Sequence, residues 1–283
     1  MNGFINVIKP SGISSAGVVG KVKRALKCDC GHMGTLDPMA KGILPIALGK
    51  TCRLFDYLLD KEKTYVAEFR FGCETDTLDK TGKVTATSSV IPTKKEIEKV
   101  LPVFIGEINQ IPPKYSAKCV DGKKGYELAR KGVEFELKPK KVKIFGLTLL
   151  EYENAVLKLT IDCGGGTYVR SLGRDIGYAL NTLAVMESLD RTKSGAFDYD
   201  SGVTLDDFLA SEDKTEYVLP SDFPLDFDKI TLDAENAKRL KDGLPRWCKK
   251  PEGLYTVYSP TGILCIGEVK DGVLKGKTYV DER

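Results

Sequence analysis

The stretch from Gly31 to Pro45 limits the fold of this chain more than any other part of the sequence. It holds the only histidine, His32, together with three glycines and two prolines. Glycine permits positive φ and close backbone approach, whereas proline fixes φ and removes an amide donor. Neither the strand period of 2 nor the helix period of about 3.6 runs through residues 31–39. These residues are therefore predicted to form a shaped loop.

Asp37 lies in the middle of this loop, directly before Pro38. The helical region is disfavoured for a residue that precedes proline, so Asp37 is predicted to be extended. A rigid loop that presents one carboxylate suits a catalytic or binding site. The competing interpretation is an Asx-turn, in which the Asp37 side chain only bonds to its own backbone. The residues of the loop leave both interpretations open.

Hydrophobic patterns on both sides of the loop predict a mixture of strands and helices. In the strand at residues 63–71, Tyr65, Ala67, Phe69 and Phe71 share one face, and Lys63 is assigned to the other. Strands are predicted at residues 4–8, 43–48, 63–71, 142–152 and 155–163, the last two forming a hairpin. Helices are predicted at residues 15–26, 51–59, 93–101 and, with Thr167 as N-cap, 168–180.

The composition of the 283 residues is that of a soluble globular protein, with 42% hydrophobic and 29% charged residues. Lys and Arg outnumber Asp and Glu by only 43 to 40, which is weak evidence for a nucleic-acid partner. The most basic region, residues 114–143, interleaves lysines with aromatic residues and fits an RNA-facing surface, although solvated lysines are the ordinary interpretation. Residues 200–235 are acidic and contain Pro220 and Pro224, which predicts a domain boundary near residue 222.

Several classes of function find no support in the sequence. No stretch approaches the ~20 apolar residues of a membrane span, so we expect a cytoplasmic protein without a membrane partner. The eight cysteines are too dispersed for a disulfide scaffold, and a closed zinc site at residues 28–32 would need distant ligands. Gly49-Lys50-Thr51 is not a phosphate loop, because Leu44 stands where that motif needs a glycine. We expect neither a metal nor another cofactor.

The run Gly-His-x-Gly-Thr-Leu-Asp-Pro-x-Ala-x-Gly-x-Leu-Pro, from Gly31 to Pro45, resembles the signature of the TruB family of tRNA pseudouridine synthases. One position departs from it, since Met33 replaces the usual threonine behind His32. The resemblance implies an α+β fold in which helices flank a central mixed, mainly antiparallel sheet. It also implies a catalytic domain of residues 1–222 and a small β-rich, PUA-like RNA-binding domain of residues 223–283.

The same resemblance implies an activity and a partner. A monomer would bind the T stem-loop of tRNA, flip its uridine at position 55 out of the stack, and isomerise it to pseudouridine without a cofactor. By resemblance, Asp37 is the nucleophile or the group that deprotonates C2′. Tyr65 stacks on the base and takes the C5 proton, and Arg170 pairs with Asp37.

Five further residues are implied to bind the substrate or support the site. His32 is expected to act as a wedge or stacking platform, and Leu189 to pack against the base. Asp79 is expected to hold the nucleotide or a hydrogen bond in the site. The full set of substrate-binding residues implied by the resemblance is His32, Lys9, Asp79, Tyr168 and Leu189.

Two of these positions can also be interpreted without the family. A tyrosine in a strand, such as Tyr65, most often belongs to the core. Arg170 falls in the first turn of its predicted helix, where the macrodipole disfavours a cation, which indicates another reason for its presence.

Two rival functions make different demands on the sequence. A non-catalytic RNA-binding or tRNA-folding protein on the same fold predicts that Asp37, Tyr65 or Arg170 is replaced, and all three are present. A metal-dependent hydrolase predicts clustered carboxylates or histidines near the loop, where only Asp29 and Asp37 occur.

Overall fold

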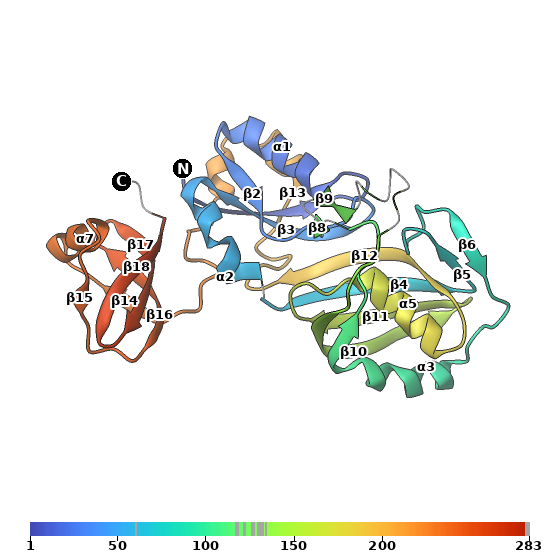
Figure 1. The fold of residues 1–283 in the computed structure, drawn as a ribbon. Helices are drawn as coiled ribbons and strands as arrows, with labels where there is room; N and C mark the ends of the chain where they lie inside the picture. Colours follow the sequence, from blue (N-terminus) through green and yellow to red (C-terminus); the bar gives the residue numbers. More distant parts are fainter. Residues whose placement is uncertain are drawn as a thin grey trace. The chain divides into compact units, whose positions relative to one another are not determined.

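The computed structural model describes residues 1–59, 61–116, 119–120, 123–125, 128, 133 and 135–280, and Figure 1 shows the course of the chain. The chain divides into two compact units. Unit 1 consists of Met1–Asp37, Ile43–Leu59 and Gly195–Arg283, and unit 2 consists of Pro38–Gly42 and Asp60–Ser194. The chain therefore passes from unit 1 to unit 2 directly after Asp37.

The first part of unit 1 combines short strands with one long helix. Strand β1 (Gly3–Lys9) pairs in parallel with β13 (Val203–Thr204), and β2 (Cys30–His32) pairs antiparallel with β3 (Lys41–Leu48). Helix α1 (Ser15–Leu26) begins where the Ser14 hydroxyl accepts a hydrogen bond from the Gly17 amide. The short helices of this unit are η1 (Gly49–Leu54), α2 (Phe55–Leu59), α6 (Leu205–Ala210) and η3 (Lys214–Tyr217).

A hydrophobic cluster holds the strands and short helices of unit 1 together. Phe4 of β1 and Phe197 lie ring to ring at 5.4 Å, and Ala47 of β3 packs into the same cluster. Met33 is buried in this cluster as well, with 4% of its surface exposed. The residue that departs from the expected threonine is therefore part of the core behind His32.

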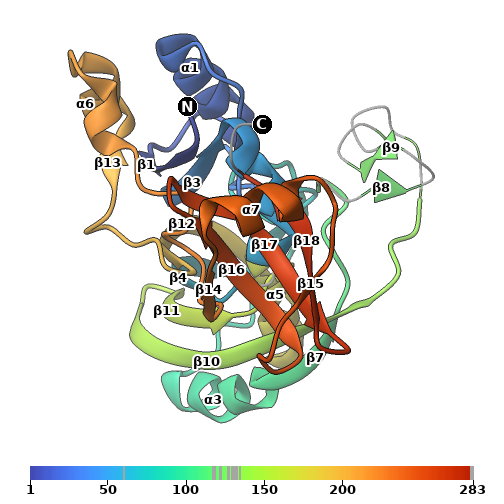
Figure 2. The ribbon, with the colours of Figure 1, turned by 90° about the vertical axis from the view of Figure 1, so that its left-hand side faces the viewer.

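The C-terminal part of unit 1 is a five-stranded sheet with the order β14-β16-β17-β18-β15 (Figure 2). Helix α7 packs against it through Ala237 and Leu240. This helix begins where the Asp233 carboxylate accepts a hydrogen bond from the Asn236 amide. The elements are β14 (Lys229–Thr231), α7 (Ala234–Lys241), β15 (Arg246–Trp247), β16 (Gly253–Ser259), β17 (Gly262–Lys270) and β18 (Val273–Tyr279).

Unit 2 is built on antiparallel strands in the order β12-β4-β11-β10-β7. Lys41 and Gly42, the first residues of β3, pair in parallel with Asp190 and Arg191 of β12. A mixed, mainly antiparallel sheet with helices and a β-rich C-terminal part confirms the predicted α+β fold. These strands are β4 (Lys63–Phe71), β7 (Gly106–Gln110), β10 (Lys140–Glu153), β11 (Val156–Cys163) and β12 (Ala184–Ser194).

The other elements of unit 2 lie between these strands in the sequence. Helix α3 starts with a capping box, in which Thr93 and Glu96 bond each other's backbone amides. The elements are β5 (Cys73–Thr75), β6 (Val84–Thr87), α3 (Lys94–Val100), η2 (Leu101–Phe104), β8 (Cys119–Val120), β9 (Lys123–Lys124) and α5 (Val169–Ala179).

The burial of β4 follows the predicted alternation, with one correction. Tyr65, Ala67 and Phe69 are buried on one face, as predicted. Lys63 was assigned to the opposite face, and this is wrong, because it is 7% exposed on the same face as Tyr65. Its stem is buried, and its ammonium donates to the Lys61 carbonyl at 2.8 Å.

Three other local predictions need correction or comment. Cys30–His32 forms strand β2, so the irregular loop starts only at Met33. Thr167 is not the N-cap of α5, because its hydroxyl donates back to the Gly164 carbonyl at 2.9 Å and Tyr168 takes the cap position. The basic region of residues 114–143 lies partly outside the described residues, so it stays a prediction.

The predicted boundary at residue 222 also stays a prediction. The C-terminal sheet starts at Lys229, and its residues belong to the same compact unit as β1 and α1. Within the described part of the chain, none of the helices has the length and apolarity that crossing a bilayer demands.

Helix α5 approaches β4 closely because residue 173 is glycine. A Cβ at Gly173 would lie 2.3 Å from Phe69 Cδ1 and 2.4 Å from its Cε1. We predict that Gly173→Ala lowers the free energy of unfolding by about 1–3 kcal/mol, through overpacking. The urea midpoint, at unchanged m, measures this change.

Gly20 in α1 provides the matched control, because a Cβ there would have no neighbour within 4 Å. Gly20→Ala is predicted to raise the unfolding free energy by about 0.5–1 kcal/mol, since alanine loses less backbone entropy in a helix. An unchanged midpoint for Gly173→Ala beside a raised one for Gly20→Ala contradicts the close packing of α5 on β4.

Candidate active site

The loop that carries Asp37 is held at two points inside unit 1. At its start, the Met33 amide donates to the Pro45 carbonyl at 2.8 Å. At its end, the buried Ser15 hydroxyl donates to the Leu36 carbonyl at 2.9 Å and accepts from the Leu36 amide at 2.8 Å. Asp37 itself is half-buried, between buried Leu36 and exposed Pro38. A carboxylate directly after such an anchor is kept in a defined place.

His32 and Lys9 also belong to unit 1. His32 ends β2, is half-buried, and pairs with Ile46 of β3. Lys9 ends β1 with no exposed surface, and its ammonium donates to the Pro10 carbonyl at 2.9 Å. A buried ammonium is costly unless polar groups satisfy it, so Lys9 is an unusual residue for a position with only a structural role.

In unit 2, Tyr65 and Leu189 share one face of the sheet. Arg191 of β12 pairs directly with Tyr65 of β4, and Leu189 pairs with Ala67. Directly paired residues of antiparallel strands point to the same face, so Leu189 is a diagonal neighbour of Tyr65. Both side chains are 6% exposed, which places an aromatic ring and an aliphatic chain together in a largely dry setting.

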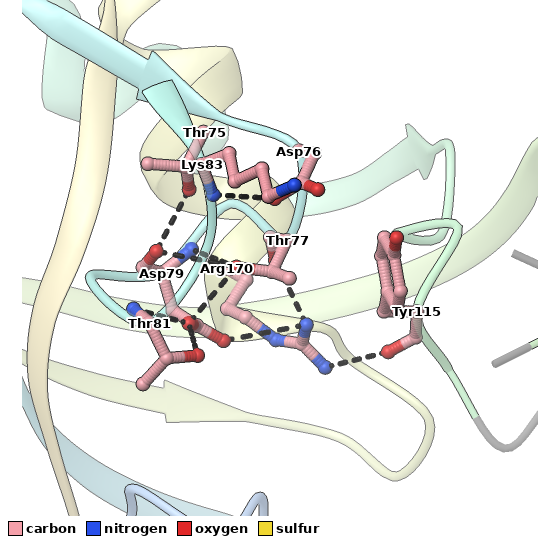
Figure 3. A network of polar contacts seen from close by, with 8 residues as sticks. All are labelled: Thr75, Asp76, Thr77, Asp79, Thr81, Lys83, Tyr115 and Arg170. Atoms are coloured by element: carbon pink, nitrogen blue, oxygen red, sulfur yellow. Dashed lines mark hydrogen bonds and ion pairs between the residues drawn. The ribbon is translucent and has the colours of Figure 1, made fainter. Parts of the chain in front are cut away.

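The Arg170 side chain contacts residues of two loops (Figure 3). Its Nη1 donates to the Thr77 carbonyl at 2.8 Å and lies 3.6 Å from Asp79 Oδ2. Its Nη2 donates to the Tyr115 carbonyl at 3.0 Å. Both members of this ion pair are almost fully buried. The guanidinium therefore joins the start of α5 to two loops that are distant in the sequence.

The Asp79 carboxylate is bonded by residues of its own loop as well as paired with Arg170 (Figure 3). Its Oδ1 accepts from the Thr77 hydroxyl at 3.0 Å and from the Thr81 amide at 2.9 Å. The loop is tied to β12, because the Lys80 amide donates to the Met186 carbonyl at 2.9 Å. Oδ2 thus keeps a fixed orientation toward the guanidinium.

Tyr168 is fixed through its backbone. Its amide donates to the Gln110 Oε1 at 2.8 Å, and Gln110 is 1% exposed. In the first turn of α5, the Ser171 hydroxyl donates to the Ile111 carbonyl at 2.8 Å. The segment after β7 therefore holds the first turn of the helix that carries Arg170.

The structure brings together only some of the predicted residues. Asp79 and Arg170 form an ion pair. The expected role of Asp79, to hold the nucleotide or a hydrogen bond in the site, stays a prediction. The predicted partner of Arg170 was Asp37. Because these two residues belong to different compact units, that pairing stays a prediction.

Two residues of this region were not selected from the sequence. Arg191 is 1% exposed and pairs with Tyr65 and, on its other side, with Gly42. Lys63 lies two positions before Tyr65 on the same buried face. The signal for both was the period-2 spacing, because a charged residue two positions from Leu189 or from Tyr65 must share its face.

One thiol in each unit has a raised pKa. Burial raises the pKa of Cys30 to about 11 and that of Cys163 to about 11. Both thiols are therefore protonated near neutral pH in the structure as it stands. Among the described residues, no group of three or more His, Cys, Asp or Glu side chains is placed to hold a metal ion.

Two models of one protein family match the chain. Residues 23–169 match the TruB family pseudouridylate synthase N-terminal domain, and residues 170–226 match the tRNA pseudouridylate synthase B C-terminal domain. The tRNA pseudouridine synthase B of Aquifex aeolicus is 39% identical over 98% of this chain and 99% of its own. That of Caulobacter vibrioides is 39% identical over 97% of this chain and 94% of its own.

The fold of this chain is similar to that of solved structures. A chain from the crystal structure of a Cbf5-Nop10-Gar1 complex superposes with a TM-score of 0.75 at 24% identity, over 99% of this chain and 85% of that one. Because the match to the pseudouridylate synthase N-terminal domain covers half of the chain and the two curated relatives cover nearly all of it, the chain belongs to the TruB family of pseudouridylate synthases.

Proposed function

We propose that this protein converts the T-loop uridine of tRNA, at position 55, to pseudouridine. Family membership supports the reaction class, and the curated relatives named tRNA pseudouridine synthase B support tRNA as the substrate. The single observation that carries the proposal is the presence of Asp37 in a family-type loop anchored at Met33 and Leu36. The target must leave its stack before a side chain can reach it.

The reaction rearranges bonds without any net change of oxidation state. The N1–C1′ glycosidic bond breaks, the uracil turns, and a C5–C1′ bond forms. The proton leaves C5 and N1 gains one, so atoms and electrons balance within the nucleotide. The residues therefore have to ionise one group, hold a detached base and move one proton.

Asp37 is the group assigned to the sugar. Its carboxylate either attacks C1′ or removes the C2′ proton, and both routes require the ionised form. A guanidinium beside it favours ionisation and fixes its orientation, which is the role proposed for Arg170. The ion pair with Asp79 and the two carbonyl contacts would hold that guanidinium before the substrate arrives.

Tyr65 and Leu189 are assigned to the base. Their shared position on one face of β4 and β12 suits the face of a flat ring, with Tyr65 stacked on the uracil and placed to take the C5 proton. His32 would fill the space that the flipped nucleotide leaves, and Lys9 and Tyr168 would contact the nucleotide or its surroundings. The protein is proposed to act as a monomer in the cytoplasm.

The C-terminal residues 223–283 are proposed to be a separate RNA-binding domain of the PUA-like kind. The five-stranded sheet with its own buried cluster supports this division. A non-catalytic RNA-binding function is the second candidate, but the retention of Asp37, Tyr65 and Arg170 favours the enzyme.

We predict that Asp37→Asn abolishes conversion while the dissociation constant for tRNA changes less than about threefold, because the substitution removes a reactive group from an intact loop. Tritium release from C5-labelled uridine in a T stem-loop measures the reaction, and filter binding measures affinity. Undiminished tritium release by the variant defeats the assignment of Asp37.

Asp79→Asn tests the positioning of Arg170. The amide keeps an acceptor for Thr81 but turns an NH₂ group toward the guanidinium, so kcat is expected to fall at least about tenfold, equivalent to about 1.4 kcal/mol. Asp76→Asn is the matched control, because Asp76 accepts from the Lys83 amide on the same loop. Equal kcat values for the two variants contradict the positioning role.

The affinity for tRNA is predicted to depend strongly on salt. Lysine contacts to phosphates release counterions, so the dissociation constant should rise at least about tenfold between about 50 and about 200 mM salt. Filter binding over this range provides the measurement. A flat response excludes a phosphate-binding surface.

A further inference from the structure

A cavity opens between the two edge strands of the C-terminal sheet. Strands β14 and β15 are the outer strands of that sheet, and both border a hollow of about 400 Å³. Residues 229–232 line it from one side and residues 246–250 from the other. The two edges therefore face each other without hydrogen bonding to one another in the described residues. A hollow of this size falls within the range of ligand pockets.

Every charged side chain that lines this hollow is positive. They are Lys229, Arg246, Lys249 and Lys250, contributed by both edges. Residues 229–280 contain ten Lys and Arg residues against six Asp and Glu residues, so the local excess of positive charge belongs to the whole sheet. Four cations around one opening attract a polyanion.

Trp247 lies among these cations and is the only tryptophan of the chain. It is 82% exposed, more than any other large apolar side chain of the described residues. So exposed an indole can stack on a flat partner such as a nucleobase. Because it lines the opening, Trp247 can contact the same ligand as the four cations.

The backbone of Trp247 is held in the sheet, where it pairs with Val273 of β18. A Cβ at Gly272 would lie 3.8 Å from the ring, so the turn between β17 and β18 supports it. The Cys248 amide donates to the Gly272 carbonyl at 2.8 Å, which fixes the following residue to the same turn. The indole thus lies beside this turn, while most of its surface stays exposed.

We propose that this opening binds an unpaired stretch of RNA, with one base stacked on Trp247 and the flanking phosphates on Lys249, Lys250, Lys229 and Arg246. Aromatic platforms beside a positive groove are the usual means of holding single-stranded nucleic acid. The inference rests on the proposed function, because tRNA is the RNA that the enzyme would hold. An extended polypeptide could instead pair with the free edges of β14 and β15, but four cations and no acid favour RNA.

The lone tryptophan makes the test specific. The full chain is titrated with an oligocytidylate of about six nucleotides, which contains no uridine to occupy the active site. Stacking is expected to quench the tryptophan fluorescence to saturation. A blunt RNA duplex of equal length is expected to quench far less, because its bases are already stacked.

Two substitutions separate stacking from charge. The dissociation constant is measured by the fluorescence anisotropy of a 5′-labelled oligocytidylate. Trp247→Ala is expected to raise this constant at least about fivefold, whereas Trp247→Phe is expected to keep most of the affinity. Lys249→Gln/Lys250→Gln is expected to lower the slope of log affinity against log salt by about 1.4, or about 0.7 for each phosphate contact. The control is Lys238→Gln/Arg239→Gln, two exposed cations on α7 outside the opening, which should leave the slope unchanged.

Three results overturn the proposal. The first is the absence of quenching by the oligocytidylate, and the second is equal quenching by the duplex. The third is an equal salt slope for Lys249→Gln/Lys250→Gln and for the control Lys238→Gln/Arg239→Gln. Conversion of a T stem-loop by the same preparation is measured in parallel. If the protein converts the T stem-loop but shows no quenching, only the RNA site at Trp247 is refuted. If the protein without substitutions does not convert the T stem-loop, the proposed function is refuted.

Discussion

The buried guanidinium of Arg170 is the constraint on which the candidate site of unit 2 depends. A cation in the first turn of a helix opposes the helix dipole, and burial adds a desolvation cost. Asp79 and the carbonyls of Thr77 and Tyr115 offset that cost together. Three segments distant in the sequence thus share one charge, and each is fixed by the other two. Removal of any partner would leave a buried cation incompletely satisfied.

The same principle of anchored loops appears in unit 1, where neutral hydrogen bonds replace the ion pair. The backbone bond of Met33 and the two bonds of Ser15 to Leu36 hold the residues before Asp37. Burial of Met33 adds an apolar anchor at a position where related proteins are expected to carry threonine. An apolar residue suits this position because the Met33 side chain packs into the cluster around Phe4.

Much of the fold could be predicted from local signals in the sequence. Alternation predicted β4, and the predicted helices at residues 15–26 and 93–101 begin within one residue of the observed starts of α1 and α3. The N-cap of α5 was missed because Thr167 bonds backward to Gly164, a choice that glycine-rich loops leave open. The partnership of Arg170 with Asp79 depends on how distant segments meet, which no local pattern encodes. The exposure of Trp247 beside the basic opening could not be predicted, because it depends on where the two edge strands of the C-terminal sheet lie.

In the proposed function, a family-type loop with Asp37 acts on one uridine of tRNA. The decisive experiment treats tRNA that carries no modifications with the purified protein and maps the modified bases. Pseudouridine is expected at the T-loop uridine and at no other position. Absence of any pseudouridine, or its formation only outside the T loop, would contradict it.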